Sequence, residues 1–430
     1  MSLFGQLPED FLHVVWKSLH FSLSTLQTTD GQSIQIISPG IHNQDAGPDF
    51  LDAQLRIGGM QWFGHVEIHL DSEDWYRHKH QHDPAYDAVV LHVVGKSGKR
   101  LAQRSDGSHI PELSLEGRIP AEAVRRYHHL QLNQRQIPCE GLQDNISAAI
   151  KTQWVEELSR RRLQEKTQQM RLQLKQNVQD WDQVLWEQLM RYLGGPVNQA
   201  AFENLSQRIP YRILNSYRSR PLALEAVLLG GSGCLSGSAQ DEYQEALQTE
   251  WQFLRAKHDL SASPPFALKF SRMRPAGFPT IRLAQMAQVI TECYPLGQLL
   301  EPEGMQAFIA KEIRASHYWD THYRVGIPGK GSPKRLGEMY KRILLTNVLL
   351  PLRWIQLHQK SDQGDPWQEI SNTLQTFPKE LNRHTRPLTS LKFPHQHAMH
   401  SQGLIELYRT YCEPHRCLHC EIGQEILSSK

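Results

Sequence analysis

Apolar residues recur at every second position in several short stretches between residues 33 and 113. The stretches begin at Ile34, Ala53, His65 and Ala88. A two-residue period places alternate side chains on opposite faces of an extended strand, so this pattern predicts a β-sheet. Residues 9–22 instead carry apolar side chains at helical spacing, which predicts a helix packed against that sheet.

After a loop at residues 133–145, the spacing of apolar residues becomes helical. The longest candidate helix covers residues 150–178, and others follow up to residue 411, with a loop expected at residues 385–402. A chain of 430 residues is too long for one ordinary core. We therefore expect an α+β protein with an N-terminal mixed-sheet domain (residues 1–135) and a mostly α-helical C-terminal region with a cysteine knuckle (residues 136–430).

The composition narrows the class of protein. A hydrophobic fraction of 39% and a charged fraction of 21% are typical of a folded globular chain, and the net charge of +2 favours no class of partner. The longest apolar run, residues 343–355, is interrupted and is shorter than the roughly 20 residues of a membrane span. The chain has only six cysteines, so we expect a reducing, cytoplasmic location. Charged residues at positions 9 and 10 stand where a signal peptide would be apolar, so we expect neither a signal peptide nor a membrane segment.

One predicted strand combines an apolar face with a chemically active one. In residues 65–71, alternation places Val66, Ile68 and Leu70 on one side, and the other side carries His65, Glu67, His69 and Asp71. Burying imidazoles and carboxylates is costly unless they are paired or bind a cation. The stretch from Asn43 to His92 is therefore the expected metal site; the alternative is a solvated polar face whose histidines are incidental.

An acid at the start of one strand can meet an acid in the middle of its antiparallel neighbour. Pro48-Asp49 followed by Glu67-Ile68-His69 is similar to the PD-(D/E)xK nuclease pattern, which has a lysine where this chain has His69. The resemblance implies that Asp49 and Glu67 bind Mg²⁺ or Mn²⁺, with His69 as base or further ligand. His78 or Lys79 would then stabilise the developing charge on a phosphate.

A second candidate site lies near the C-terminus. Cys412, Cys417 and Cys420 fall within nine residues, and Cys139 in the central loop is a candidate fourth ligand. Four thiolates would suit a structural Zn²⁺ or an iron–sulfur cluster. The alternative is a group of free, partly buried cysteines.

The chain as a whole resembles the domain-of-unknown-function 2851 family of bacteria. The residues that carry this resemblance lie along nearly the whole chain: 43–50, Val66–His69, Asp74-Trp75, His78, His80, Tyr86-Asp87, Leu91–Val94, Ile137–Cys139, Arg274–Arg282, Trp319–Tyr323 and Cys417–Gly423. The family implies no activity.

Three functional hypotheses remain at this point. The first is a metal-dependent nuclease or phosphodiesterase that acts on DNA or RNA. The second is a different Zn²⁺- or Fe²⁺-dependent hydrolase that uses His65, Glu67 and His69. The third is a non-catalytic nucleic-acid-binding or scaffold protein with a structural metal, in which basic residues such as Arg160 to Arg162 contact the nucleic-acid backbone.

Overall fold

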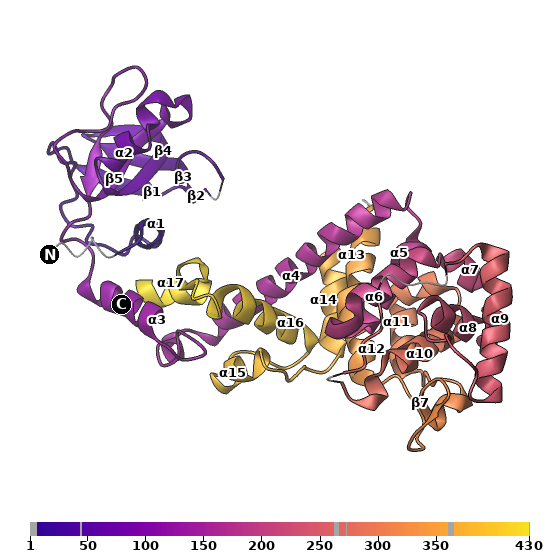
Figure 1. Cartoon of the computed structure of the whole chain (residues 1–430). Coiled ribbons are helices and arrows are strands. Elements are labelled where there is room, and N and C mark those ends of the chain that lie inside the picture. Colours follow the sequence, from indigo (N-terminus) through magenta and orange to yellow (C-terminus); the bar gives the residue numbers. More distant parts are fainter. Residues whose placement is uncertain (1–6, 44, 262–265, 272, 360–364, 430) are drawn as a thin grey trace. The chain divides into compact units, whose positions relative to one another are not determined.

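The structure is a computed structural model that describes residues 7–43, 45–261, 266–271, 273–359 and 365–429 (Figure 1). The chain forms two compact units. Unit 1 comprises Met1–Ser159, Lys379–Gln396 and His400–Lys430, and unit 2 comprises Arg160–Pro378 and His397–Met399. Unit 1 therefore includes residues from both ends of the sequence, and the expected domain boundary at residue 135 falls inside it.

The predicted mixed sheet is present in unit 1. Its strands are β1 (Ile34–Ser38), β2 (Ile41–His42), β3 (Phe50–Ile57), β4 (Met60–Asp71), β5 (Val89–Lys96) and β6 (Glu112–Ser114). The order is β1-β3-β4-β5-β6, with β2 also paired to β3. The β1–β3 and β3–β4 pairs are antiparallel, whereas β4–β5 and β5–β6 are parallel. The α+β class expected from the sequence is confirmed.

Local turn chemistry sets the register of the sheet. Gly58 and Gly59 connect β3 to β4 with φ angles of +57° and +86°, as a tight two-residue hairpin requires. The parallel connection from β4 to β5 is made by α2 (Asp74–Arg77), η2 (His80–His82) and η3 (Pro84–Tyr86). This crossover segment, residues 72–88, contains the predicted His78 as well as His80 and His82.

Helix α1 (Glu9–Lys17) packs against β4, as its apolar spacing predicted (Figure 1). The other helices of unit 1 are α3 (Ala121–Leu132), η4 (Gln143–Asn145), the start of α4 (Ala148–Gln176), α15 (Thr385–Ser390), most of α16 (Ala398–Glu406), η9 (Leu407–Cys412), η10 (Cys417–His419) and α17 (Glu421–Ser428). One core contains buried residues of the sheet, of α1 and of the C-terminal helices.

The loop expected at residues 385–402 is wrong, because α15 and the start of α16 lie there. Two side-chain hydroxyls hold this segment to the backbone of Glu380. The hydroxyl of Thr385 donates to the carbonyl of Glu380 at 2.8 Å, and the backbone N–H of Glu380 donates to the hydroxyl of Ser401 at 2.8 Å. These contacts come from tertiary packing, which local polarity does not reveal.

Unit 2 is mostly helical, as expected. Its helices are the remainder of α4, α5 (Trp181–Leu193), α6 (Gly195–Arg208), α7 (Tyr211–Ser216), α8 (Pro221–Gly231), α9 (Glu242–His258), η5 (Pro275–Gly277), α10 (Pro279–Glu292), η6 (Leu296–Leu300), α11 (Pro302–Ala310), η7 (His317–Asp320), α12 (Glu338–Leu344), η8 (Leu345–Leu349), α13 (Leu350–Gln359) and α14 (Pro366–Thr376), with a hairpin of β7 (His322–Arg324) and β8 (Ile327–Pro328). Helix α8 is buried on all sides and forms the centre of this core.

The described helices include none that is long and apolar enough to cross a membrane.

Candidate metal centre

Strand β4 positions the first two residues of the site. It lies between β3 and β5 in the middle of the sheet, and Glu67 and His69 project from the same face of it because they are two residues apart. Both side chains are buried, with exposed fractions of 5% and 1%. The crossover segment covers this face, and the fully buried Trp75 lies edge-on to His69.

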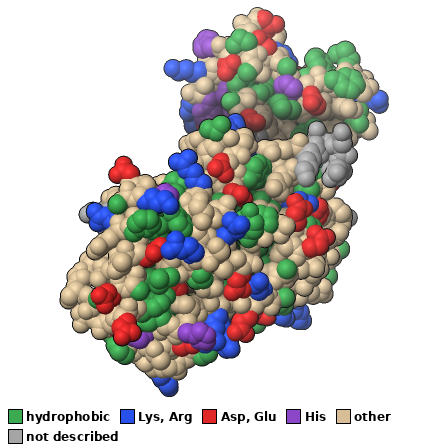
Figure 2. Space-filling view, turned by 90° about the vertical axis from the view of Figure 1, so that its right-hand side faces the viewer, with side chains coloured by type: hydrophobic (Ala, Val, Ile, Leu, Met, Phe, Trp, Pro, Cys, Tyr) green, Lys and Arg blue, Asp and Glu red, His purple; other side chains and the backbone are tan. Residues whose placement is uncertain are grey.

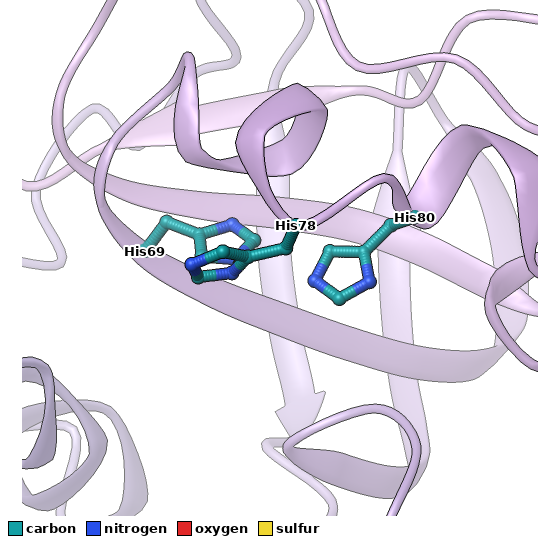
Figure 3. A group of neighbouring side chains, drawn as sticks. All are labelled: His69, His78 and His80. Carbon is teal, nitrogen blue, oxygen red and sulfur yellow. The ribbon is translucent and has the colours of Figure 1, made fainter.

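Three imidazoles converge over β4 (Figure 3). His69 comes from the strand, and His78 and His80 come from the crossover segment; one ligand nitrogen of each lies within 4.8 Å of the others. Lys79 has a left-handed backbone, with φ of +65°. This turn ends α2 and lets two residues that are only two positions apart face the same point.

Glu67 adds a carboxylate oxygen beside two of the three imidazoles. Its Oε1 lies 3.6 Å from His69 Nε2 and 3.4 Å from His80 Nε2, and His69 Nε2 lies 3.2 Å from His78 Nδ1. Two ligands on one tetrahedral ion, bound at about 2.0 to 2.1 Å, stand about 3.3 Å apart. The three imidazoles gather as one group, and Glu67 contacts two of them, so we name Glu67, His69, His78 and His80 the histidine–glutamate cluster.

Burial sets the protonation of this cluster. Burial, followed by the neighbouring imidazoles, lowers the pKa of His69 to about 2 and that of His80 to about 4. Both rings are thus neutral at pH 7, which is the form that binds metal. Burial and the nearby charge of Asp49 raise the pKa of Glu67 to about 9. A bound cation favours the carboxylate and would reverse that shift.

Two buried side chains, His92 and Glu112, form a relay behind His69; the His69–His92 contact is a hydrogen bond, and the His92–Glu112 contact is a longer polar contact. His69 Nδ1 lies 2.9 Å from Nε2 of His92 on β5, and His92 Nδ1 lies 3.6 Å from Oε2 of Glu112 on β6. Ser72 donates to the same carboxylate oxygen at 2.5 Å. The parallel register pairs His92 with Glu112 directly. Partners of this kind fix the tautomer and orientation of a metal-binding histidine.

Asp49 contacts Glu67 through its backbone. The backbone N–H of Asp49 donates to Glu67 Oε2 at 3.1 Å, and Asp49 Oδ2 accepts the N–H of Ile68 at 2.9 Å. His13 of α1 also reaches this carboxylate, with Nε2 3.4 Å from Asp49 Oδ2. Burial opposes the charged form of His13, but the hydrogen bond and charge of Asp49 outweigh it and raise its pKa.

Like Asp49, two further predicted residues lie outside the cluster. His65 Nδ1 accepts the N–H of Asp52 at 3.3 Å, and the side chain of Lys79 is exposed. Neither His80 nor His13 was among the site residues predicted from the sequence. His13 did carry a signal, because it is a polar residue inside the apolar stretch of α1 and is only 9% exposed.

The predicted cysteines are also brought together. Cys139, Cys412, Cys417 and Cys420 are buried, have free thiols and line one small pocket in unit 1.

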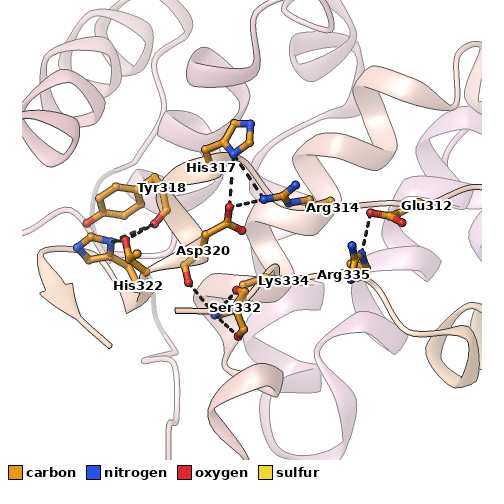
Figure 4. Close-up of polar contacts among 10 residues, drawn as sticks. Glu312, Arg314, His317, Tyr318, Asp320, His322, Ser332, Lys334 and Arg335 are labelled. Atoms are coloured by element: carbon orange, nitrogen blue, oxygen red, sulfur yellow. Dashed lines mark hydrogen bonds and ion pairs between the residues drawn. The ribbon is translucent and has the colours of Figure 1, made fainter. Parts of the chain in front are cut away.

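A further concentration of charge, in unit 2, is satisfied by its own members (Figure 4). Arg314 pairs with Asp320, and Arg335 Nε lies 2.7 Å from Glu312 Oε1. Lys334 donates to the carbonyls of Ser332 at 2.6 Å and Asp320 at 3.3 Å. These contacts order the loops around β7, so we assign this network a structural role.

Residues 9–383 match the family described as "Protein of unknown function (DUF2851)". The chain belongs to this family. The matched range contains the whole histidine–glutamate cluster and Cys139, whereas the other three cysteines of the pocket follow it. No curated protein and no solved structure matches this DUF2851 protein.

Proposed function

We propose that this DUF2851 protein is a metal-dependent hydrolase that cleaves phosphodiester bonds in nucleic acid, with its ion held by Glu67, His69, His78 and His80. The observation that carries the proposal is the spacing of the ligand atoms, 3.2 to 3.6 Å between neighbours. Hydrogen bonding alone does not require three imidazoles to converge on one point with a carboxylate beside two of them.

The donor set favours a transition metal. Three imidazole nitrogens and one carboxylate oxygen suit Zn²⁺, Fe²⁺ or Mn²⁺, whereas Mg²⁺ prefers oxygen ligands. The proposal thus combines the first two sequence hypotheses. It keeps Glu67 and His69 and replaces His65 with His78 and His80.

The neighbouring side chains supply proton transfer. The ion itself would lower the pKa of a bound water and polarise a phosphate oxygen. His13, whose pKa Asp49 raises, would donate a proton to the leaving oxygen. The cluster is also accessible, because His78 is exposed while His69 is buried.

Exposed basic side chains support a phosphodiester as substrate. Arg77 and Lys79 flank His78 in the crossover segment, and Arg100 Cζ lies 3.7 Å from the ring centroid of Tyr76 beside them. Such groups can contact the phosphates of a nucleic acid. On the face shown in Figure 2, basic and acidic side chains are interspersed, so we place the contact near the cluster rather than over the whole surface.

Metal analysis of the untagged full chain tests the proposal. We expect about one equivalent of a transition metal at this site, lost in His69→Ala and His80→Ala and retained in the control His82→Ala, whose side chain is exposed. Cobalt-substituted protein shows whether the ion has nitrogen and oxygen ligands, which separates it from an ion held by cysteines.

Hydrolysis is then measured on single- and double-stranded DNA and RNA with Mn²⁺, Zn²⁺ or Fe²⁺. Cleavage should disappear in the two variants that lose the metal and persist in His82→Ala. Metal binding without cleavage of any of these substrates would overturn the substrate class. Failure of the cluster to bind any of the three ions would overturn the whole proposal.

A further inference from the structure

The four buried cysteines come from distant parts of the sequence. Cys139 follows α3, Cys412 ends η9, and Cys417 and Cys420 flank η10. All four line one pocket whose other walls are mostly apolar: Pro138, Phe393, Leu407, Tyr411 and Ile422. Their exposed fractions are only 6% to 8%.

The sulfur of Cys420 faces backbone donors. It accepts hydrogen bonds from the backbone N–H groups of Ile422 and Gly423 in the first turn of α17. Hydrogen bonds to an ionised acceptor are the stronger ones, and such N–H donors commonly surround metal-bound sulfur.

All four sulfurs line the same small, mostly apolar pocket. Four thiolates in such a place repel one another and lack hydration, so they require a cation between them. Lys151 lies close enough for its charge to favour ionised Cys139, but a single ammonium does not balance four negative charges.

The backbone around the pocket is close-packed. A Cβ atom on Gly423 would lie 2.0 Å from the carbonyl oxygen of Cys417. Only glycine allows α17 to start this close to the turn that carries Cys417 and Cys420.

The spacing of the cysteines indicates which centre they hold. Four residues separate Cys412 from Cys417, two separate Cys417 from Cys420, and the fourth cysteine is remote. The same C-x₄-C-x₂-C spacing with a remote cysteine binds the iron–sulfur cluster of plant-type ferredoxins.

We infer that Cys139, Cys412, Cys417 and Cys420 bind an iron–sulfur cluster. Each thiol loses its proton to solvent when its sulfur bonds to iron, and the iron and inorganic sulfide are supplied from outside the chain. The cluster links the segment after α3 to the C-terminal segment of unit 1. Helix α17 in that segment packs on α1 and α3, so the cluster anchors the helices that support the sheet.

The test uses the full chain, purified without oxygen and reconstituted with ferrous iron and sulfide. We expect iron and acid-labile sulfide in equal amounts, about two or about four of each per chain, with visible absorption that bleaches on reduction. The stoichiometry and the electron paramagnetic resonance spectrum distinguish the two cluster types. Cys417→Ser should lose the cluster, and Cys234→Ser, a cysteine of the unit 2 core, should keep it.

Mössbauer spectra of the unaltered protein keep the inference testable if Cys417→Ser does not fold. Iron with sulfide in these spectra supports the cluster. Reconstituted protein that holds neither, or that binds one Zn²⁺ through four sulfurs, overturns it. Both outcomes are independent of the histidine–glutamate cluster.

Discussion

Nδ1 of His69 lies 2.9 Å from Nε2 of His92, and the two rings meet edge to face. If Nε2 of His69 binds the ion, its Nδ1 carries the proton and donates it to His92. The ring N–H of His92 then lies at Nδ1, which faces the carboxylate of Glu112 at 3.6 Å. The relay thus selects the one tautomer of His69 that leaves Nε2 free for metal.

Replacing His92 with alanine should therefore weaken metal binding without removing a ligand. Loss of such a partner typically costs about 10- to 100-fold in affinity, which competition with a chelator measures. His109→Ala is the matched control, since His109 is exposed. Unchanged affinity in His92→Ala would show that the relay does not orient His69.

Replacing Lys79 with glycine distinguishes a catalytic role of its ammonium group from a conformational role of its backbone. Its left-handed backbone turns the chain between His78 and His80, and glycine adopts that conformation without the roughly 1 to 2 kcal/mol cost of a side chain. Lys79→Gly should keep the metal and be at least as stable to urea as the parent. If cleavage nevertheless falls by about 100-fold or more, the ammonium takes part in the reaction.

Asp49→Asn distinguishes a proton-transfer partner from a metal ligand. Asp49 touches Glu67 through its backbone N–H, which the substitution keeps, while its carboxylate faces His13. We expect metal content to remain and hydrolysis to fall by about 10²- to 10⁴-fold, the usual contribution of general acid–base catalysis. Loss of the metal in this variant would instead make Asp49 a ligand, as the nuclease pattern predicted.

Gly423→Ala should destabilise unit 1, because the added methyl group meets the Cys417 carbonyl at 2.0 Å. Overpacking of this kind costs about 1 to 3 kcal/mol or more in the free energy of unfolding. Gly331→Ala is the control, since nothing lies within 4 Å of its Cβ position. Equal urea midpoints for the two variants would contradict the close packing of this turn.

Glu225 makes the stability of unit 2 depend on pH. Its carboxylate accepts hydrogen bonds from Trp319 at 2.7 Å and Tyr243 at 3.0 Å, but burial outweighs both and raises its pKa. The native state then holds the proton more tightly than the unfolded state, whose pKa is about 4.3. The stabilisation of unit 2 by protonated Glu225 is fully present below the unfolded-state pKa, and it is lost as pH rises toward the native-state pKa.

Glu225→Gln keeps the acceptor oxygen and removes the ionisation. Between pH 5 and pH 8, the unfolding free energy of the parent should fall more steeply than that of the variant, by up to about 1.4 kcal/mol per pH unit. Urea unfolding at several pH values measures the two slopes. Parallel slopes would mean that Glu225 is not held protonated.

The sequence alone determined the strand positions, the face of β4 that carries Glu67 and His69, and the helical character of unit 2. These features follow from side-chain period, which is local. The sequence also led us to expect Asp49 beside Glu67, because an acid at the start of one strand can meet an acid in the middle of its antiparallel neighbour, and β3 and β4 are such a pair. The expectation that Cys139 approaches the C-terminal cysteines arose from composition and could not be derived from spacing.

Only the tertiary structure decided which residues share each site. His80 joined the cluster because the backbone of Lys79 turns at one residue, and His13 entered because α1 packs on β4. His92 and Glu112 became partners of His69 through the parallel register of β5 and β6. The spacing of apolar residues assigns a side chain to one face of a strand or helix. Its partners on that face come from remote segments of the chain, and distance along the sequence does not reveal which segments lie close in space.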